Sequence, residues 1–172
     1  MLRVVGIATL TEEAIELDGY TVIVRWNNLY QRGHVFWRTG DIPHSILEIG
    51  IKESNHVLEV ARIVTVLSTS IQSREVIDFD DAGSSVQEGV PIIDWTWDSP
   101  SPYYVDEVGD FNIYAGESHL TIQIGVESKV DRILVADRTR FAIDANDNLI
   151  GIQLRNLSTD EMKTLRSTFR LQ

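Results

Sequence analysis

The 172-residue chain contains no cysteine, and this absence excludes several classes of protein. A disulfide scaffold, a thiolate zinc site, an iron–sulfur cluster and a cysteine nucleophile all need the missing residue. No apolar run approaches the roughly 18 residues that a membrane-spanning helix needs. The apolar run at residues 4–8 is too short for the core of a secretory signal and reads as a first strand. We therefore expect a cytoplasmic protein without membrane contact, and its length predicts a single domain over residues 1–172.

Basic residues are scarce and unevenly spread along the chain. There are 15 Lys+Arg against 26 Asp+Glu, which gives a formal net charge of −11. Residues 75–128, here called the base-free stretch, contain no lysine or arginine, while the rest of the chain is balanced to within one charge. The acids of this stretch are Glu75, Asp78, Asp80, Asp81, Glu88, Asp94, Asp98, Asp106, Glu107, Asp110, Glu117 and Glu127. Such a balance argues against a nucleic-acid partner, which requires clustered positive charge.

The hydrophobic pattern predicts a mostly antiparallel β-sheet. Apolar runs at residues 14–17 and 20–24 flank Asp18-Gly19, which is a strong signal for a two-residue hairpin turn. Further strands are expected at residues 33–38, 90–97 and 119–126. A second hairpin is expected to join residues 140–143 to residues 149–154.

Two segments are expected to be helical. Ser158 and Glu161 have the spacing of a capping box at the start of a short C-terminal helix. Residues 54–73 place polar side chains at intervals of three and four, which favours a helix with a wide buried side. Many β-branched residues in the same segment favour a strand instead. The expected fold is therefore α+β, with a mostly antiparallel sheet, one central helix and a short C-terminal helix, and the alternative is an all-β sandwich.

Local motifs for catalysis or metal binding are few. The loop that begins at Asp78 resembles the start of a calcium loop, but Gly89 stands where a bidentate glutamate is required. Asp94 and Asp98 would share a strand face about 13 Å apart, at about 3.3 Å per residue, which is too wide for paired glycosidase carboxylates. The four histidines have no paired spacing. We therefore expect no catalytic residue, no metal and no cofactor, and a carboxylate-based hydrolase remains an alternative.

Aromatic residues interleave with the acids of the base-free stretch. Trp95 and Trp97 alternate with acids in the expected strand, and Tyr103 and Tyr104 follow a proline-containing loop. The two indoles either belong to the core or form an exposed platform together with the tyrosines. Aromatic anchors beside acids suit the capture of a basic protein, whereas a sugar would use only the aromatic faces. The expected partner-binding residues are Asp94, Trp97, Asp98, Tyr103, Tyr104, Asp106, Glu107 and Asp110.

These observations favour a non-catalytic binding protein that neutralises a basic protein partner. In its most concrete form, it is an immunity-type inhibitor that covers the cationic active site of a nuclease toxin by imitating phosphate charge. A carboxylate-based hydrolase and a carbohydrate-binding module that uses the Trp/Tyr cluster are the alternatives.

Overall fold

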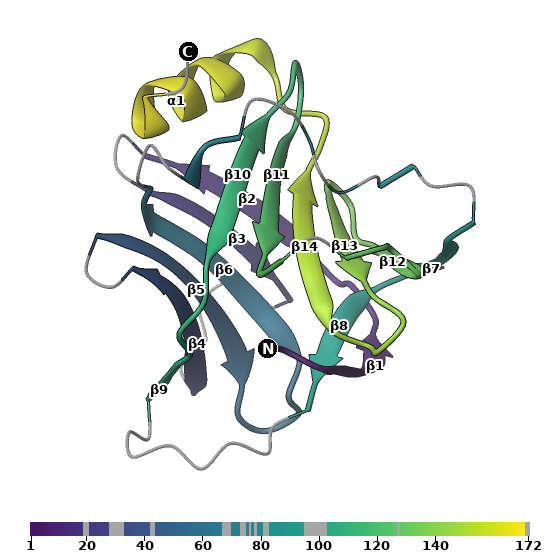
Figure 1. Ribbon diagram of the computed structural model, residues 1–172. Coiled ribbons are helices and arrows are strands. Elements are labelled where there is room, and N and C mark those ends of the chain that lie inside the picture. Colours follow the sequence, from purple (N-terminus) through teal and green to yellow (C-terminus); the bar gives the residue numbers. More distant parts are fainter. Residues whose placement is uncertain are drawn as a thin grey trace.

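Strands make up most of the described part of the chain. The computed structural model describes residues 1–18, 21–27, 33–41, 44–66, 70–72, 75, 77, 79–80, 83–94, 103–126 and 128–170. Within these residues there are fourteen strands and one helix (Figure 1). The all-β alternative fits this arrangement, and the expected α+β class does not.

Two six-stranded sheets and one two-stranded ribbon form the framework. Sheet I has the order β2 (Glu13–Leu17), β3 (Val22–Trp26), β6 (Leu58–Thr65), β5 (Ser45–Lys52), β4 (His34–Asp41) and β9 (Tyr104–Asp106). Sheet II has the order β10 (Phe111–Ala115), β11 (Leu120–Ile124), β14 (Leu149–Leu154), β13 (Thr139–Ile143), β12 (Arg132–Val135) and β7 (Ser85–Glu88). The ribbon pairs β1 (Val4–Ala8) with β8 (Val90–Ile93). Neighbouring strands are antiparallel except at β4–β9 and β12–β7, where the edge strand of each sheet is parallel.

The two sheets share one apolar core. Strands of both sheets contribute fully buried side chains to a single cluster, including Leu47 and Ile49 from sheet I and Ile113 and Ile152 from sheet II. The ring of Trp26 in β3 meets that of Phe141 in β13 edge-on, with their centroids 5.1 Å apart. Face-to-face packing of two sheets in this way is the architecture of a β-sandwich.

The two ends of the sandwich are closed by different elements (Figure 1). The ribbon β1–β8 lies at one end and joins sheet I through the Val57–Ile92 bridge and sheet II through the Arg3–Asn148 bridge. At the other end lies α1 (Thr159–Phe169), which buries Phe169 and two further apolar residues in the core. No helix of the described residues is long and apolar enough to cross a membrane.

Several local expectations from the sequence are confirmed. Strands β2 and β3 form the first hairpin, although Leu17 pairs with Val22, so the loop has four residues, two of which lie outside the described part. Strands β13 and β14 form the second hairpin. Helix α1 begins with the expected capping box, in which Glu161 N–H donates to Ser158 Oγ and Ser158 N–H donates to the Glu161 carboxylate.

The expected central helix over residues 54–73 is wrong. Its centre is β6, which lies between β3 and β5 in the middle of sheet I, while residues 67–69 and 73 lie outside the described part of the chain. The register against β5 shifts twice, so Glu59 and Val64 each stand as an extra residue without a directly opposed partner. Such bulges break the two-residue alternation that identifies a strand in a sequence. Within β6, the bulged residues Glu59 and Val64 interrupt the alternation, so the polar spacing there does not mark a helical turn.

Glu59 also misled the assignment because its charge is buried. Its side chain is only 7% exposed, and Oε2 lies 2.7 Å from His34 Nε2 and 3.9 Å from Lys52 Nζ. His34 and Lys52 are opposed residues of β4 and β5. A glutamate paired in this way can occupy the interior of a sheet, where a pattern based on polarity expects a solvent-facing side chain.

Candidate functional site

The chain crosses from one sheet to the other immediately after β9. Residues 107–110 leave the edge of sheet I and lead into β10 at the edge of sheet II. This crossover is held by backbone hydrogen bonds on both sides. Glu107 N–H donates to Arg38 O (2.9 Å), Gly40 N–H to Gly109 O (3.0 Å), and Gly125 N–H to Asp110 O (2.9 Å). The crossover backbone is therefore fixed before any partner arrives.

Exposed apolar side chains gather along this crossover. Val108 is fully exposed, Val126 is 78% exposed and Tyr103 is 70% exposed. Met1 and Tyr104 are exposed as well, so five of the eight large exposed hydrophobic residues in the described part of the chain belong to this region. Folding gains nothing from an apolar side chain that remains in water, so this concentration marks a candidate contact surface.

A groove of about 470 Å³ runs beside the crossover. The described residues that line it are Met1, Trp37, Thr39, Glu107, Val108, Gly109, Asp110, Asn112, Gln123, Ile124, Gly125 and Val126. We call this the crossover groove. Its rim carries two carboxylates, from Glu107 and Asp110, and two exposed valines. No lysine or arginine is among the described lining residues, but the amino group of Met1 is present and pairs with Glu107. Asp110 therefore supplies the excess negative charge that the groove presents next to its apolar surface.

Glu107 contributes a carboxylate to the groove and also binds two residues of its lining, Trp37 and Met1. Its Oε2 accepts a hydrogen bond from Trp37 Nε1 (2.8 Å), and Oε1 forms an ion pair with the amino group of Met1. Trp37 is almost completely buried, so its indole anchors the Glu107 carboxylate from the core side. Asp110 is exposed and has no ion-pair partner among the described residues.

Asp106 and Tyr104 are tied to a single arginine on β4. Arg38 Nε and Nη2 donate to the two Asp106 carboxylate oxygens, at 2.6 and 2.8 Å. The same guanidinium lies 3.9 Å from the centre of the Tyr104 ring. The hydrogen bond to Asp106 raises the pKa of Arg38 above its ordinary value, although partial burial opposes it. The carboxylate of Asp106 is thus paired within the chain, and the guanidinium that it holds lies against the Tyr104 ring.

The expected partner-binding residues separate into three groups. Tyr103, Tyr104, Asp106, Glu107 and Asp110 lie on β9 and the crossover, as one continuous segment. Asp94 follows the ribbon strand β8, where its N–H donates to Arg3 O (2.8 Å), and it is not among the groove residues. Trp97 and Asp98 lie outside the described residues, as does Trp95.

Sequence reasoning missed the apolar part of this surface. Val108 and Val126 each stand in a loop between charged or glycine residues, where burial offers no reason for an apolar side chain. This position in a loop was the only feature of the sequence that could have identified Val108 and Val126 as exposed apolar residues. Among the other lining residues, Asn112 and Gln123 are opposed partners in the consecutive strands β10 and β11, whereas Trp37 comes from the distant strand β4 and shares no local signal with them.

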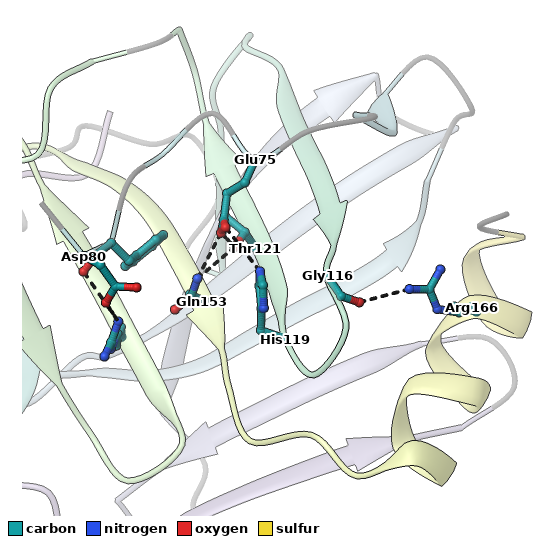
Figure 2. Close-up of polar contacts among 9 residues, drawn as sticks. Glu75, Asp80, Gly116, His119, Thr121, Gln153 and Arg166 are labelled. Carbon is teal, nitrogen blue, oxygen red and sulfur yellow. Dashed lines mark hydrogen bonds and ion pairs between the residues drawn. The ribbon is translucent and has the colours of Figure 1, made fainter.

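Two acids of the base-free stretch have partners on the strands of sheet II. On the outer face of sheet II, Glu75 lies 3.2 Å from His119 Nε2, accepts a hydrogen bond from Gln153 Nε2 (2.9 Å), and accepts a further one from Thr121 Oγ1 (Figure 2). Asp80 forms an ion pair with Arg140 at 2.7 Å. These contacts hold the segment before β7 against the sheet. They also show that only part of the acidity of the stretch remains free for a partner.

The described residues contain no group of three histidine, cysteine, aspartate or glutamate side chains that could hold a metal ion. The sequence matches no protein-family model, and comparison with curated proteins finds no significant relative.

Proposed function

We propose that this is a cytoplasmic, non-catalytic binding protein that docks a basic protein partner on the crossover groove. The observation that carries the proposal is Val108, a fully exposed valine on a backbone fixed by both sheets and flanked by Glu107 and Asp110. Interfaces obtain much of their affinity from a few pre-ordered apolar anchors, and complementary charge around them raises the association rate.

The acidic rim defines the chemistry of the partner. A lysine or arginine of the partner would meet Asp110, beside the Glu107 carboxylate that already pairs with the Met1 amino group. An apolar side chain of the partner would cover Val108 and Val126. The most specific form of this proposal is an immunity-type inhibitor that occludes the cationic active site of a nuclease toxin.

Sugar binding receives less support from the same surface. A sugar ring would stack on an open aromatic face, but one face of Tyr104 is covered by the Arg38 guanidinium. The charged rim also offers a neutral sugar no advantage over a basic protein.

The test compares two exposed valines. Val108→Arg places a bulky positive charge on the crossover groove, and Val86→Arg makes the same change on β7, where Val86 is 65% exposed. Immobilised wild-type protein and both variants are incubated with lysate of the source cells at about 50 mM and about 500 mM salt, because this range shortens the screening length severalfold. Melting temperatures check that both variants fold.

We expect wild type and Val86→Arg to retain the same basic protein at low salt and to release it at high salt, whereas Val108→Arg retains little of it. The captured protein is then purified and its affinity measured, with a loss of at least about tenfold expected for Val108→Arg, as for a hot-spot residue. Equal affinity of the wild type and Val108→Arg would exclude the crossover groove as the docking site. Inhibition of a nuclease activity of the captured protein would establish the immunity-type form.

A further inference from the structure

A second and larger cavity, of about 770 Å³, lies at the far edge of sheet II, where β12 and the β7–β8 corner meet the end of β1. The described residues that line it are Ile7, Ala8, Thr9, Leu10, Glu88, Gly89, Val135, Ala136, Asp137 and Arg155. It shares no described residue with the crossover groove. Half of its lining residues are apolar, and Arg155 is the only cation among them.

Arg155 differs from most of the arginines in the described part of the chain. Six arginines of the described residues have carboxylate partners: Arg25, Arg38, Arg62, Arg132, Arg138 and Arg140. The guanidinium of Arg155 instead makes one hydrogen bond, from Nη2 to the backbone oxygen of Asp137 (3.2 Å). Its Nε is buried and has no partner in the described structure. No carboxylate among the described residues pairs with Arg155, so its charge can pair with an acceptor that enters the cavity.

The acids of the cavity restrict what this acceptor can be. Glu88 and Asp137 are exposed residues at the rim, whereas Arg155 is half-buried. Two rim carboxylates repel a ligand in proportion to its negative charge, which disfavours phosphates and nucleotides. A planar monoanion matches the guanidinium fork and suffers the least repulsion. Apolar walls formed by Ile7, Leu10 and Val135 favour a ligand with an apolar body.

We propose that this cavity binds an organic carboxylate with an apolar body, whose carboxylate pairs with Arg155. The same chemistry is present in a small free acid and in the C-terminal residue of a peptide chain. This proposal does not depend on the proposed function of the crossover groove.

The test uses phenylacetate as the probe and phenylacetamide as its neutral counterpart, with binding to the full-length protein measured by calorimetry or ligand-observed NMR. We expect phenylacetate to bind wild type at least about tenfold more tightly than phenylacetamide, because a charge-assisted pair is lost with the amide. Arg155→Gln should lose the same factor. Arg166→Gln is the matched control, because Arg166 also donates to a backbone oxygen, that of Gly116 (3.0 Å), but lies outside the cavity (Figure 2).

A second variant should change the affinity for phenylacetate in the opposite direction, and it alters an exposed residue only. Glu88→Gln removes a rim charge from an exposed position and should tighten phenylacetate binding by about twofold, because one water-screened repulsion between two negative charges is lost. Glu53→Gln, an exposed change of the same kind on another part of the surface, should leave binding unchanged.

Two further probes distinguish the sources of the carboxylate. Acetyl-Ala-Leu with a free C-terminus is compared with its C-terminal amide. Tighter binding of the free peptide than of phenylacetate would assign the cavity to a chain terminus, and the reverse would assign it to a small acid. The proposal is overturned if neither carboxylate binds wild type, or if Arg155→Gln and Arg166→Gln bind phenylacetate equally well.

Discussion

Glu59 offers a sharp test of the fold, because a helix and a strand at this position predict very different losses of stability when the residue is substituted. On the outward face of a helix over residues 54–73, Glu59→Ala would change the free energy of unfolding by less than about 0.5 kcal/mol. In strand β6 the carboxylate is 7% exposed and contacts His34 and Lys52, which are themselves 11% and 13% exposed. Removing it takes away the carboxylate that His34 and Lys52 both contact. Breaking a buried ion pair on one side costs about 3–5 kcal/mol.

Urea unfolding followed by tryptophan fluorescence measures this difference. With a slope of about 2 kcal/mol per molar urea, the midpoint of Glu59→Ala should fall by about 1.5–2.5 M. Glu53→Ala is the control, since Glu53 is exposed in the turn between β5 and β6, and its midpoint should stay close to that of wild type. A midpoint for Glu59→Ala within about 0.3 M of the control would refute the buried pairing.

Three further substitutions test other parts of the sandwich. Burial raises the pKa of Glu13 above 4.5, although hydrogen bonds from the Arg138 backbone and the Trp26 indole oppose this shift. Ionisation of Glu13 therefore lowers the stability of the folded protein as the pH rises through the raised pKa. The unfolding free energy of Glu13→Gln relative to wild type should therefore improve between pH 4 and pH 8 in urea titrations, and a decline would contradict this sign. Ser158→Ala removes the cap of α1 and should cost about 1 kcal/mol in the same assay, while no loss would mean that the cap is not formed. Gly40 has φ 120°, and an added Cβ would lie 2.0 Å from Ser45 O, so Gly40→Ala should cost at least about 2 kcal/mol, and a smaller cost would show that the turn relaxes.

Elements defined by neighbouring residues were predictable from the sequence. The hairpin β13–β14 and the capping box of α1 each depend on residues only a few positions apart, so their signals survive in the local pattern. Strand β11 was also found, because its apolar residues alternate without a bulge in its pairing with β10. These elements needed no knowledge of what packs against them.

Features that depend on distant contacts were not predictable. The bulge at Glu59 and the burial of its charge result from pairing with β5 and from His34, which is 25 residues away. The crossover groove combines residues from positions 1 to 126, so its apolar members could not be recognised as neighbours. Arg38 and Asp106 lie 68 residues apart, and their ion pair removes a charge that the sequence assigned to partner binding.

The base-free stretch acquires a partly structural explanation from the strand order. Of the four edge strands of the two described sheets, three come from this stretch: β7, β9 and β10. Edge strands expose unpaired backbone groups, and charged side chains there oppose pairing with another chain. Glu88 on β7 and Asp106 on β9 are placed to act in this way. Edge protection accounts for acids, but it gives no reason for an exposed valine. The exposure of Val108 and Val126 therefore favours a binding surface over edge protection alone. If the partner binds equally well after Val108 is substituted, edge protection is sufficient to explain the acidity of the stretch.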